Sequence, residues 1–420
     1  MKVRLSPSKL NGKVAPPPSK SCLHRALICA AVADAPTKIL ASSFSKDIEA
    51  TASCLTALGA RIDYEDGFVI VHPIEKVQSE CTLDCNESGS TLRFMIPFAA
   101  ALGSKCTFVG AGRLGKRPLS PLCDALTKNG VKVSYGESFL PCTIEGRLSR
   151  GIYEIEGNIS SQFITGLLLA LGVLGDGEIR STTPLESASY IDITTDIQEK
   201  FGVLAEKKGN SFVVAGGQKY TSPSVFKTEG DYSNAAFFLV AGAISSDSGL
   251  TVSSLHEKTC QGDSKIIEIL EKMGAQIKRN EDKVTVFKSK LSAVEIDCSD
   301  IPDLVPVLCV AAASAEGRSV FYNINRLRMK ESDRVQSTAD MISSLGGKIE
   351  FDENNIYVTG TALKGGTVSS ANDHRIAMSG AVASLVCDGD VIIEDAQAVE
   401  KSYGDFYEKF RQLGGKCSEF

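Results

Sequence analysis

Leu58-Gly59-Ala60-Arg61-Ile62 marks a point at which one predicted helix ends and a strand begins. A glycine directly after an apolar helix end is typical of the left-handed residue that closes a helix. Residues 62–64 and 68–71 then flank the polar turn Glu65-Asp66-Gly67, which is typical of a β-hairpin. The stretch therefore predicts a helix followed by two antiparallel strands.

The same pattern returns five more times along the chain. Its glycines are Gly59, Gly130, Gly202, Gly274, Gly346 and Gly414. Successive steps are 71, 72, 72, 72 and 68 residues, a regularity that chance helix ends would not keep. The sequence predicts an α/β fold made of six copies of one unit.

The two ends of the chain complement each other. The last copy stops at Phe420, directly after its first strand, so it lacks a returning strand. Met1 to Leu5 alternates apolar and polar residues and belongs to no copy of its own. We expect this segment to complete the last copy, which gives one lobe from residues 1–15 with 228–420. Residues 16–227 form the other lobe.

This arrangement requires two crossings between the lobes. The first is expected near 16–18, where three prolines favour a stiff extended segment, and the second near 227–231. A single continuous solenoid is the alternative, and it would need no crossing.

Composition narrows the class of protein. The 420 residues are 43% hydrophobic and 23% charged, which is typical of a globular chain with two or three cores. The longest nearly apolar stretch, 163–174, is shorter than the ~20 residues of a membrane helix. Thirteen scattered cysteines favour reduced thiols and a cytoplasmic location. A net charge of −6 disfavours nucleic acid as a partner, so any anion site must be local.

Motifs for metals and cofactors are weak. The four histidines lack zinc-ligand spacing, and Cys81 and Cys85 have no second pair. Residues 110–115 match GxGxxG, but Pro118 stands where a helix should run uninterrupted. We therefore expect no metal and no cofactor. Arg117, on this glycine-rich turn, is a candidate phosphate contact.

Polar clusters stand at several predicted helix starts. A helix N-terminus that carries cations can receive an anion, whereas a solvated N-cap is the alternative for each cluster taken singly. Lys330 and Arg334, four residues apart, are expected on one face of a helix. The clusters are Lys20-Ser21 with Arg25, Glu87 to Arg93, Ser160-Ser161-Gln162, Arg328 to Arg334 and Asn372 to Arg375, with Lys401 near the end.

In this order, five motifs together resemble those of the 5-enolpyruvylshikimate-3-phosphate synthase family over the whole chain. They are Pro18 to Ser21, Glu87 to Ser90, Ser160 to Phe163, Lys330 to Arg334 and Asn372 to Arg375. The resemblance implies two lobes, each of three βαβαββ units with sheets around bundled helices (an inside-out α/β barrel). It also implies a cytoplasmic, monomeric enzyme of the shikimate pathway. Its substrates would be phosphoenolpyruvate and shikimate 3-phosphate, the enolpyruvyl group passing to the 5-hydroxyl with release of phosphate.

The resemblance also implies roles for individual residues. Asp303 would be the base for the attacking hydroxyl, and Glu331 would protonate the methylene carbon, with Lys20 and His374 as further candidates for proton transfer. Phosphoenolpyruvate would be bound by Lys20, Gly89, Arg117, Gln162, Arg334, Arg375 and Lys401. Shikimate 3-phosphate would be bound by Lys20, Ser21, Arg25, Ser160, Ser161, Gln162, Ser187, Asp303 and Lys330, with Tyr190 beside this set.

Some positions depart from the best-known bacterial pattern, which has Asn, Thr and Pro where Glu87, Ser90 and Phe94 stand. One alternative is the enolpyruvyl transferase for UDP-N-acetylglucosamine, which carries a cysteine in the loop equivalent to 112–118; none occurs here. An RNA-terminal phosphate cyclase or a non-catalytic RNA-binding module is another, and either would need a nucleotide pocket or a basic face.

Overall fold

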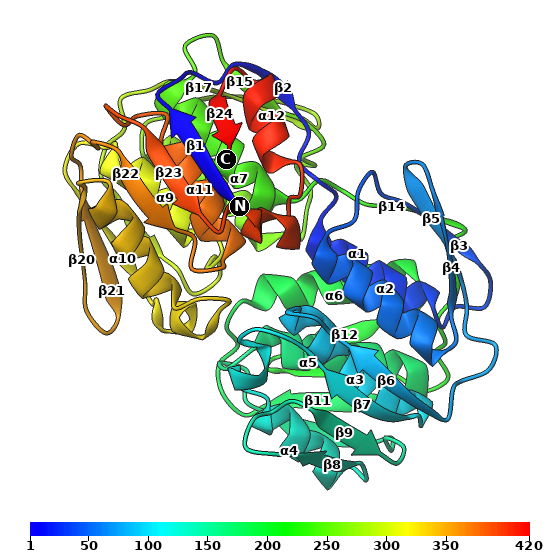
Figure 1. The fold of residues 1–420 in the computed structure, drawn as a ribbon. Helices are drawn as coiled ribbons and strands as arrows, with labels where there is room; N and C mark the ends of the chain where they lie inside the picture. Colours follow the sequence, from blue (N-terminus) through cyan, green and yellow to red (C-terminus); the bar gives the residue numbers. More distant parts are fainter. The chain divides into compact units, whose positions relative to one another are not determined.

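The computed structural model describes all residues from Met1 to Phe420. The chain divides into two compact units (Figure 1). Unit 1 consists of Met1–Pro17 with Glu229–Phe420, and unit 2 of Pro18–Thr228. Each unit contains three four-stranded sheets, and each has its own hydrophobic core.

Unit 2 contains six α-helices and twelve strands. The helices are α1 (Lys20–Ala30), α2 (Lys46–Leu58), α3 (Gly89–Leu102), α4 (Ser120–Lys128), α5 (Ser161–Leu174) and α6 (Ala188–Lys200), with the 3-10 helix η1 (Leu114–Lys116). The strands are β3 (Thr37–Leu40), β4 (Arg61–Glu65), β5 (Phe68–His72), β6 (Glu80–Asp84), β7 (Lys105–Val109), β8 (Lys132–Tyr135), β9 (Cys142–Glu145), β10 (Ile152–Ile155), β11 (Gly177–Ser181), β12 (Ala205–Lys208), β13 (Ser211–Val214) and β14 (Val225–Lys227).

Unit 1 repeats this plan. Its helices are α7 (Tyr232–Ser245), α8 (Ile266–Lys272), α9 (Val305–Ala313), α10 (Arg334–Ser344), α11 (His374–Ala383) and α12 (Phe406–Gln412), with η2 (Gly262–Lys265), η3 (Asn325–Met329) and η4 (Ala396–Lys401). Its strands are β1 (Lys2–Ser6), β2 (Gly12–Val14), β15 (Leu250–Val252), β16 (Gln276–Asn280), β17 (Lys283–Phe287), β18 (Glu295–Asp297), β19 (Arg318–Tyr322), β20 (Lys348–Phe351), β21 (Asn355–Thr359), β22 (Gly366–Ser369), β23 (Val391–Glu394) and β24 (Lys416–Glu419).

The predicted βαβαββ unit is confirmed in the second copy. There β6 pairs in parallel with β7 across α3, and β7 pairs antiparallel with β9 of the hairpin β8–β9. The six repeat glycines all have positive φ, between +79° and +116°. At Gly59 a Cβ atom would also lie 2.6 Å from the carbonyl oxygen of Lys76. The glycines therefore recur at this spacing because the backbone is left-handed at each of these positions, a conformation that glycine adopts most readily.

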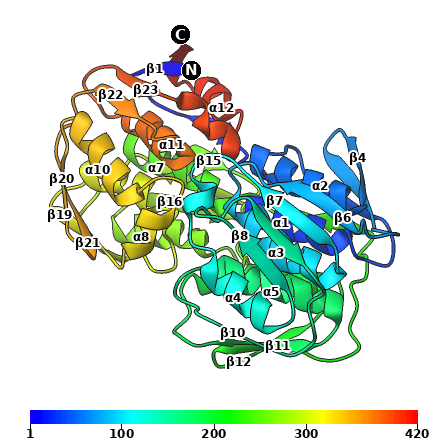
Figure 2. The same ribbon diagram turned by 60° about the horizontal axis from the view of Figure 1, so that its bottom comes forward.

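Strands from distant parts of the chain complete three of the six sheets. β1 lies between β23 and β24 and is antiparallel to both, so it supplies the strand that the sixth copy lacks. Both chain termini consequently lie side by side in unit 1 (Figure 1 and Figure 2). Sequence analysis did not predict that β2 pairs with β15, nor that β14 pairs with β3. Three-residue strands are too short to show a periodic pattern.

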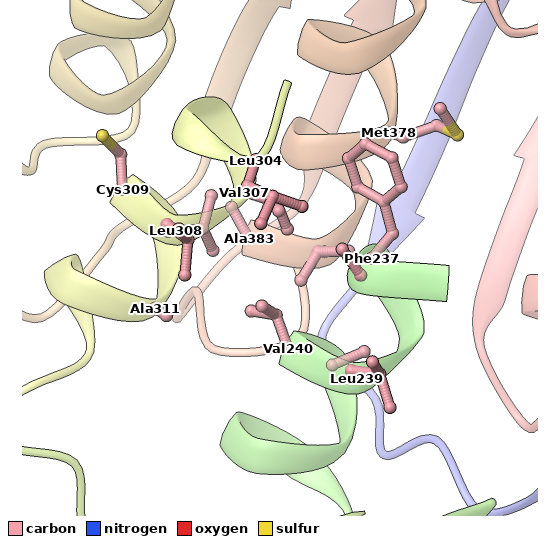
Figure 3. Packing of buried hydrophobic residues seen from close by; sticks show 14 of the residues in the cluster. Phe237, Leu239, Val240, Leu304, Val307, Leu308, Cys309, Ala311, Met378 and Ala383 are labelled. Carbon is pink, nitrogen blue, oxygen red and sulfur yellow. The ribbon is translucent and has the colours of Figure 1, made fainter. Parts of the chain in front are cut away.

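Each unit has three inner helices that are apolar nearly all round. In unit 1 these are α7, α9 and α11, which contact one another. Figure 3 shows Phe237 and Val240 of α7 near Val307 of α9 and Met378 of α11. In unit 2 the inner helices are α1, α3 and α5. The prediction of sheets around bundled helices is thus confirmed, and the starts of these buried helices carry the polar residues described next.

None of the helices combines the length and apolar character that a membrane crossing would require.

Candidate active site

In unit 1 the predicted site residues gather at helix starts. Asp303 lies just before α9, and Lys330 and Glu331 lie between η3 and α10. Asp373 is the N-cap of α11, where its carboxylate accepts the amide hydrogen of Arg375 at 2.9 Å. Because α9 and α11 are neighbouring inner helices, their N-terminal loops lie close together.

Arg334 connects three of these loops. Its side chain is 1% exposed. The guanidinium donates from Nη1 to Asp303 at 2.7 Å, from Nη2 to Glu331 at 2.6 Å and from Nε to Asp373 at 2.8 Å. Burial alone would lower the pKa of Arg334, but the three carboxylates raise it well above its ordinary value. A buried guanidinium needs such partners, so this side chain is a fixed cation.

Asp303 contacts three cations of this cluster. It accepts from Arg334, from Arg375 Nη2 at 3.0 Å and from Lys330 Nζ at 3.4 Å. Burial would raise the pKa of Asp303, but Arg375, Lys330 and Arg334 hold it well below the ordinary value. Asp303 is therefore an anion held among three cations. Anions that bound Lys330 or Arg375 would weaken this stabilisation and make Asp303 a stronger base.

The expectation that Lys330 and Arg334 share a helix face is wrong. Residues 330–333 are not helical, Lys330 has extended φ and ψ of −88° and −162°, and α10 begins only at Arg334. Asp333 caps α10 by accepting from the amides of Val335 and Gln336, and this cap excludes residue 330 from the helix. The two cations instead meet because both contact Asp303.

Burial also changes the acidity of Lys330. Desolvation lowers its pKa to about 8, helped by Arg334 and Arg326 and opposed by Asp303 and Glu331. Its ammonium group is therefore charged at neutral pH but loses its proton in mildly basic solution.

His374 and Lys401 lie at the edge of this cluster. His374 is buried at the first position of α11, with Nδ1 3.8 Å from the carboxylate of Asp373. Lys401 donates to the carbonyl oxygen of Asn372 at 2.7 Å. The structure thus brings both residues beside the start of α11.

In unit 2 the first site lies at the start of α1. Ser19 caps this helix, Lys20 is its first residue, and Lys20 forms an ion pair with Asp47 at 2.9 Å. Arg25 is 2% exposed, and it donates to Thr194, Thr165 and the carbonyl oxygens of Ser21 and Tyr190 at 2.6–3.2 Å. Burial lowers the pKa of Arg25 to about 10, so the guanidinium stays charged at neutral pH.

The second site of unit 2 joins the starts of α3 and α5. Gln162 accepts from Arg93 Nη1 at 2.7 Å and donates to the hydroxyl of Ser90 at 2.9 Å. A Cβ atom at Gly89 would lie 2.5 Å from Nη1 of Arg117 and 3.0 Å from Nη1 of Arg93. Glycine leaves room here for two guanidinium groups close to its backbone, and a side chain at this position would displace them.

Serines frame the remaining part of unit 2. Ser160 caps α5 by accepting from the amide of Gln162 at 3.3 Å, and Ser161 is the first residue of that helix. Ser187 is 1% exposed and has φ of +53°, in the left-handed region, directly before α6. A non-glycine residue in that region is a strained conformation of the kind that clusters at functional sites. Tyr190 follows in the first turn of α6.

Two residues of the predicted motifs, Arg93 and Asp373, were given no role by the sequence, and the structure shows what they contact: Arg93 donates to Gln162, and Asp373 accepts from Arg334. Sequence reasoning missed three other partners, since each comes from a distant element and no sequence signal marks it. They are Asp47 beside Lys20, and Thr165 and Thr194 beside Arg25.

Unit 1 also contains a cavity away from the candidate residues. This cavity of about 620 Å³ is lined by Ser245, Ala313 and Leu385, at or just beyond the C-terminal ends of α7, α9 and α11. The described residues contain no group of three or more His, Cys, Asp or Glu side chains that could hold a metal ion.

Comparison with known proteins identifies related chains. Residues 5–410 match a family model described as EPSP synthase (3-phosphoshikimate 1-carboxyvinyltransferase). A 3-phosphoshikimate 1-carboxyvinyltransferase of Clostridium novyi is 41% identical over 431 residues, covering 100% of this chain and 98% of that protein. The protein of the same name from Clostridium perfringens strain SM101 is 43% identical over 424 residues, covering 100% and 99%. The solved structure of EPSP synthase from Acinetobacter baumannii matches with a TM-score of 0.84 at 26% identity, covering 100% of both chains.

Proposed function

The chain belongs to the EPSP synthase family, and from this premise we propose that it is a 3-phosphoshikimate 1-carboxyvinyltransferase. It transfers the enolpyruvyl group of phosphoenolpyruvate to the 5-hydroxyl of shikimate 3-phosphate and releases phosphate. The reaction belongs to the shikimate pathway, which leads to the aromatic amino acids. The observation that carries the proposal for the site is the cluster around Asp303, where a carboxylate contacts three cations.

The residues proposed to bind shikimate 3-phosphate lie at or near helix starts. In unit 2, Arg25 is held rigidly by Thr165 and Thr194, which suits it to receive the planar carboxylate of the substrate. Ser160, Ser161, Gln162 and Ser187 would donate to the 3-phosphate, with Lys20 and Ser21 beside them. In unit 1 the proposed ligands are Lys330 for the phosphate and Asp303 for the 5-hydroxyl.

Phosphoenolpyruvate would be bound by the remaining cations. Arg334 and Arg375 would contact its carboxylate, since a guanidinium forms two parallel hydrogen bonds to such a group. Its phosphate would be bound by Lys20, Arg117, Gln162 and Lys401, and the backbone at Gly89 gives it room. Two phosphate monoesters and two carboxylates carry roughly five to six negative charges. The cations proposed for the two substrates balance these charges, and they are Lys20, Arg25, Arg117, Lys330, Arg334, Arg375 and Lys401.

Acid–base chemistry follows from these contacts. When Lys330 and Arg375 bind the anionic groups of the substrates, they stabilise the Asp303 carboxylate less, and the pKa of Asp303 rises. The carboxylate then accepts the proton of the 5-hydroxyl. The hydroxyl oxygen then bonds to the central carbon of phosphoenolpyruvate, and the methylene carbon takes a proton from Glu331. Loss of phosphate and of one proton from the new methyl group restores the double bond. Lys20 and His374 are the other groups proposed to move protons.

The test is phosphate release from purified protein. Release is expected only when shikimate 3-phosphate and phosphoenolpyruvate are both present, and it should persist after exhaustive chelation because no metal is proposed. Each substrate alone is the control. Release that required UDP-N-acetylglucosamine instead would contradict the proposal.

We also propose that the enzyme acts as a monomer in the cytoplasm. All thirteen cysteines are free thiols in the structure, as expected in a reducing compartment. Ten of them are buried, Cys81 and Cys417 are partly exposed, and Cys260 is exposed. Light scattering at working concentration tests the oligomeric state.

A further inference from the structure

Asp263 is a buried carboxylate of unit 1 that no role described above includes. It lies in η2 and is 3% exposed. Its Oδ2 accepts a hydrogen bond from the hydroxyl of Ser233, in the first turn of α7. Its Oδ1 is buried and has no hydrogen-bond partner. A buried carboxylate with a single donor is poorly stabilised as an anion.

Ser233 connects Asp263 to the proposed substrate contacts. The carbonyl oxygen of Ser233 accepts from Arg375 Nη1 at 3.4 Å. The other terminal nitrogen of Arg375 donates to Asp303 at 3.0 Å. A chain of contacts therefore runs from Asp263 through Ser233 and Arg375 to Asp303.

The charges around Asp263 favour its neutral form. Burial is the main cause, and it raises the pKa of Asp263 to about 7 together with the anions Asp303 and Asp231, whereas Arg375 and the Ser233 hydroxyl oppose the rise. On its own element, Lys265 pairs with the exposed carboxylate of Asp300 at 3.2 Å. Gln261, which precedes η2, uses its amide group for Tyr232 and Gly230.

We propose that Asp263 is a positioning residue for the reaction, which rests on the proposed function: its neutral carboxyl holds Ser233 against Arg375 and leaves the charge of Arg375 available for the carboxylate of phosphoenolpyruvate. When Asp263 ionises, its charge competes with that carboxylate for Arg375. Binding of phosphoenolpyruvate therefore weakens as the pH rises through neutrality, whereas bound substrate reacts at a similar rate.

The test compares Asp263→Asn with the wild type. Asparagine has the same shape, keeps an acceptor for Ser233 and cannot ionise. The KM for phosphoenolpyruvate is measured at about pH 6 and about pH 8.5, on either side of the pKa near 7. The wild-type KM should rise by roughly threefold to tenfold more than that of the variant, the effect of one added charge near an ionic site. Titration of the substrates affects both proteins equally and cancels in this comparison.

Ser233→Ala and Asp300→Asn complete the design. Ser233→Ala keeps the carboxyl group but removes its link to Arg375, so its KM for phosphoenolpyruvate should be raised by about threefold already at pH 6, with kcat changed less. Asp300→Asn removes an exposed carboxylate of the same unit and should follow the wild type at both pH values. Parallel KM profiles for wild type and Asp263→Asn would overturn the proposal. Wild-type turnover at pH 6 establishes the proposed function independently of this outcome.

Protein stability gives a second readout. Both proteins are neutral at this position at low pH, and only the wild type acquires a buried anion above neutrality. Because the folded-state pKa of Asp263 is raised to about 7, the wild type should lose stability relative to Asp263→Asn as the pH rises from about 4, the ordinary pKa of Asp, to about 7. Above that pH the difference should level off. Melting temperatures whose difference stays constant between about pH 4 and pH 7 would show that the folded-state pKa of Asp263 is not raised and would overturn the proposal.

Discussion

At the scale of single residues, Arg334 shows why geometry matters more than charge. Its three nitrogens reach three different carboxylates, whereas a lysine ammonium is one compact charge on a flexible stem. Arg334→Lys should therefore leave at least one buried carboxylate without its partner. We expect kcat/KM to fall by about 100-fold and the free energy of unfolding by roughly 3 kcal/mol, the usual effect of breaking a buried pair.

Arg318→Lys is the matched control for this substitution. Arg318 pairs with Glu350 at 3.0 Å, but both side chains are more than half exposed. Such pairs contribute at most about 1 kcal/mol, so activity and urea unfolding should stay close to the wild type. Equal behaviour of the two variants would show that the Arg334 cluster has no special role.

Lys330 predicts that substrate binding also depends on pH through the loss of a positive charge, whereas Asp263 acts by gaining a negative one. Its pKa of about 8 means that the free enzyme loses this cation as the pH rises above 8. The dissociation constant of shikimate 3-phosphate, measured by calorimetry, should therefore increase between about pH 7 and pH 9. Lys330→Arg keeps the charge at every pH in this range and should bind with a flatter profile. A wild-type dissociation constant that does not change would contradict the proposed contact.

Residue patterns predicted candidates better than they predicted partners. Lys20 and Arg375 stand out in the sequence because each lies in a polar cluster at a predicted helix start, whereas Asp303 was expected only from the family resemblance. Their partners Asp47 and Thr194 do not stand out, since each lies on another helix and is brought near only by tertiary packing. Asp263 also follows no local rule, and only its burial makes it notable.

At the scale of elements, β1 is a central strand made from the first residues of the chain. It pairs on one side with β23 and on the other with β24. Proline at position 4 removes a backbone donor and disturbs both ladders, so Arg4→Pro should lower the free energy of unfolding by roughly 3 kcal/mol or more. Urea denaturation followed by circular dichroism measures this change.

Arg4→Ala separates the backbone effect from the side-chain effect. The Arg4 side chain is 53% exposed and lies 4.0 Å from Asp390, so its removal should change stability by no more than about 0.5 kcal/mol. If Arg4→Pro were as mild, β1 would not be an integral part of this sheet.

Hairpins were the most predictable elements because glycine, polar turn and alternating strands are all local signals. The prediction of a helix through residues 330–333 is wrong, because the local pattern there is misleading. Its charged residues have helical spacing, but α10 begins only after Asp333, whose side chain caps the first amides of that helix. The short strands β2 and β14 depend entirely on partners more than 180 residues away, which no local pattern reports.

At the scale of the whole molecule, the two units differ in how they are encoded. Unit 2 is one continuous segment, and β14 at its end returns to pair with β3 near its start. Residues 18–228 expressed alone should therefore fold and unfold cooperatively. Residues 229–420 alone lack β1 and β2 and should remain unfolded or aggregate, as circular dichroism and thermal melting will show.

A permuted chain provides the control for this prediction. β24 and β1 are antiparallel neighbours, and the amide of Phe420 donates to the carbonyl oxygen of Lys2 at 3.1 Å. A short loop can therefore join Phe420 to Met1, and residues 229–420 followed by 1–17 should fold where 229–420 does not. Failure of the permuted chain alongside success of 18–228 would show that unit 1 needs unit 2 to fold.

The position of β1 and β2 also sets an order of events during synthesis. The ribosome makes β1 and β2 before all the other strands described here, whereas β24, a partner of β1, is made after all of them. At ~5–20 residues per second, a chain of this length takes roughly 20 to 80 seconds to complete. Unit 2 can fold in that interval, while β1 stays without its sheet partners until β23 and β24 have been made.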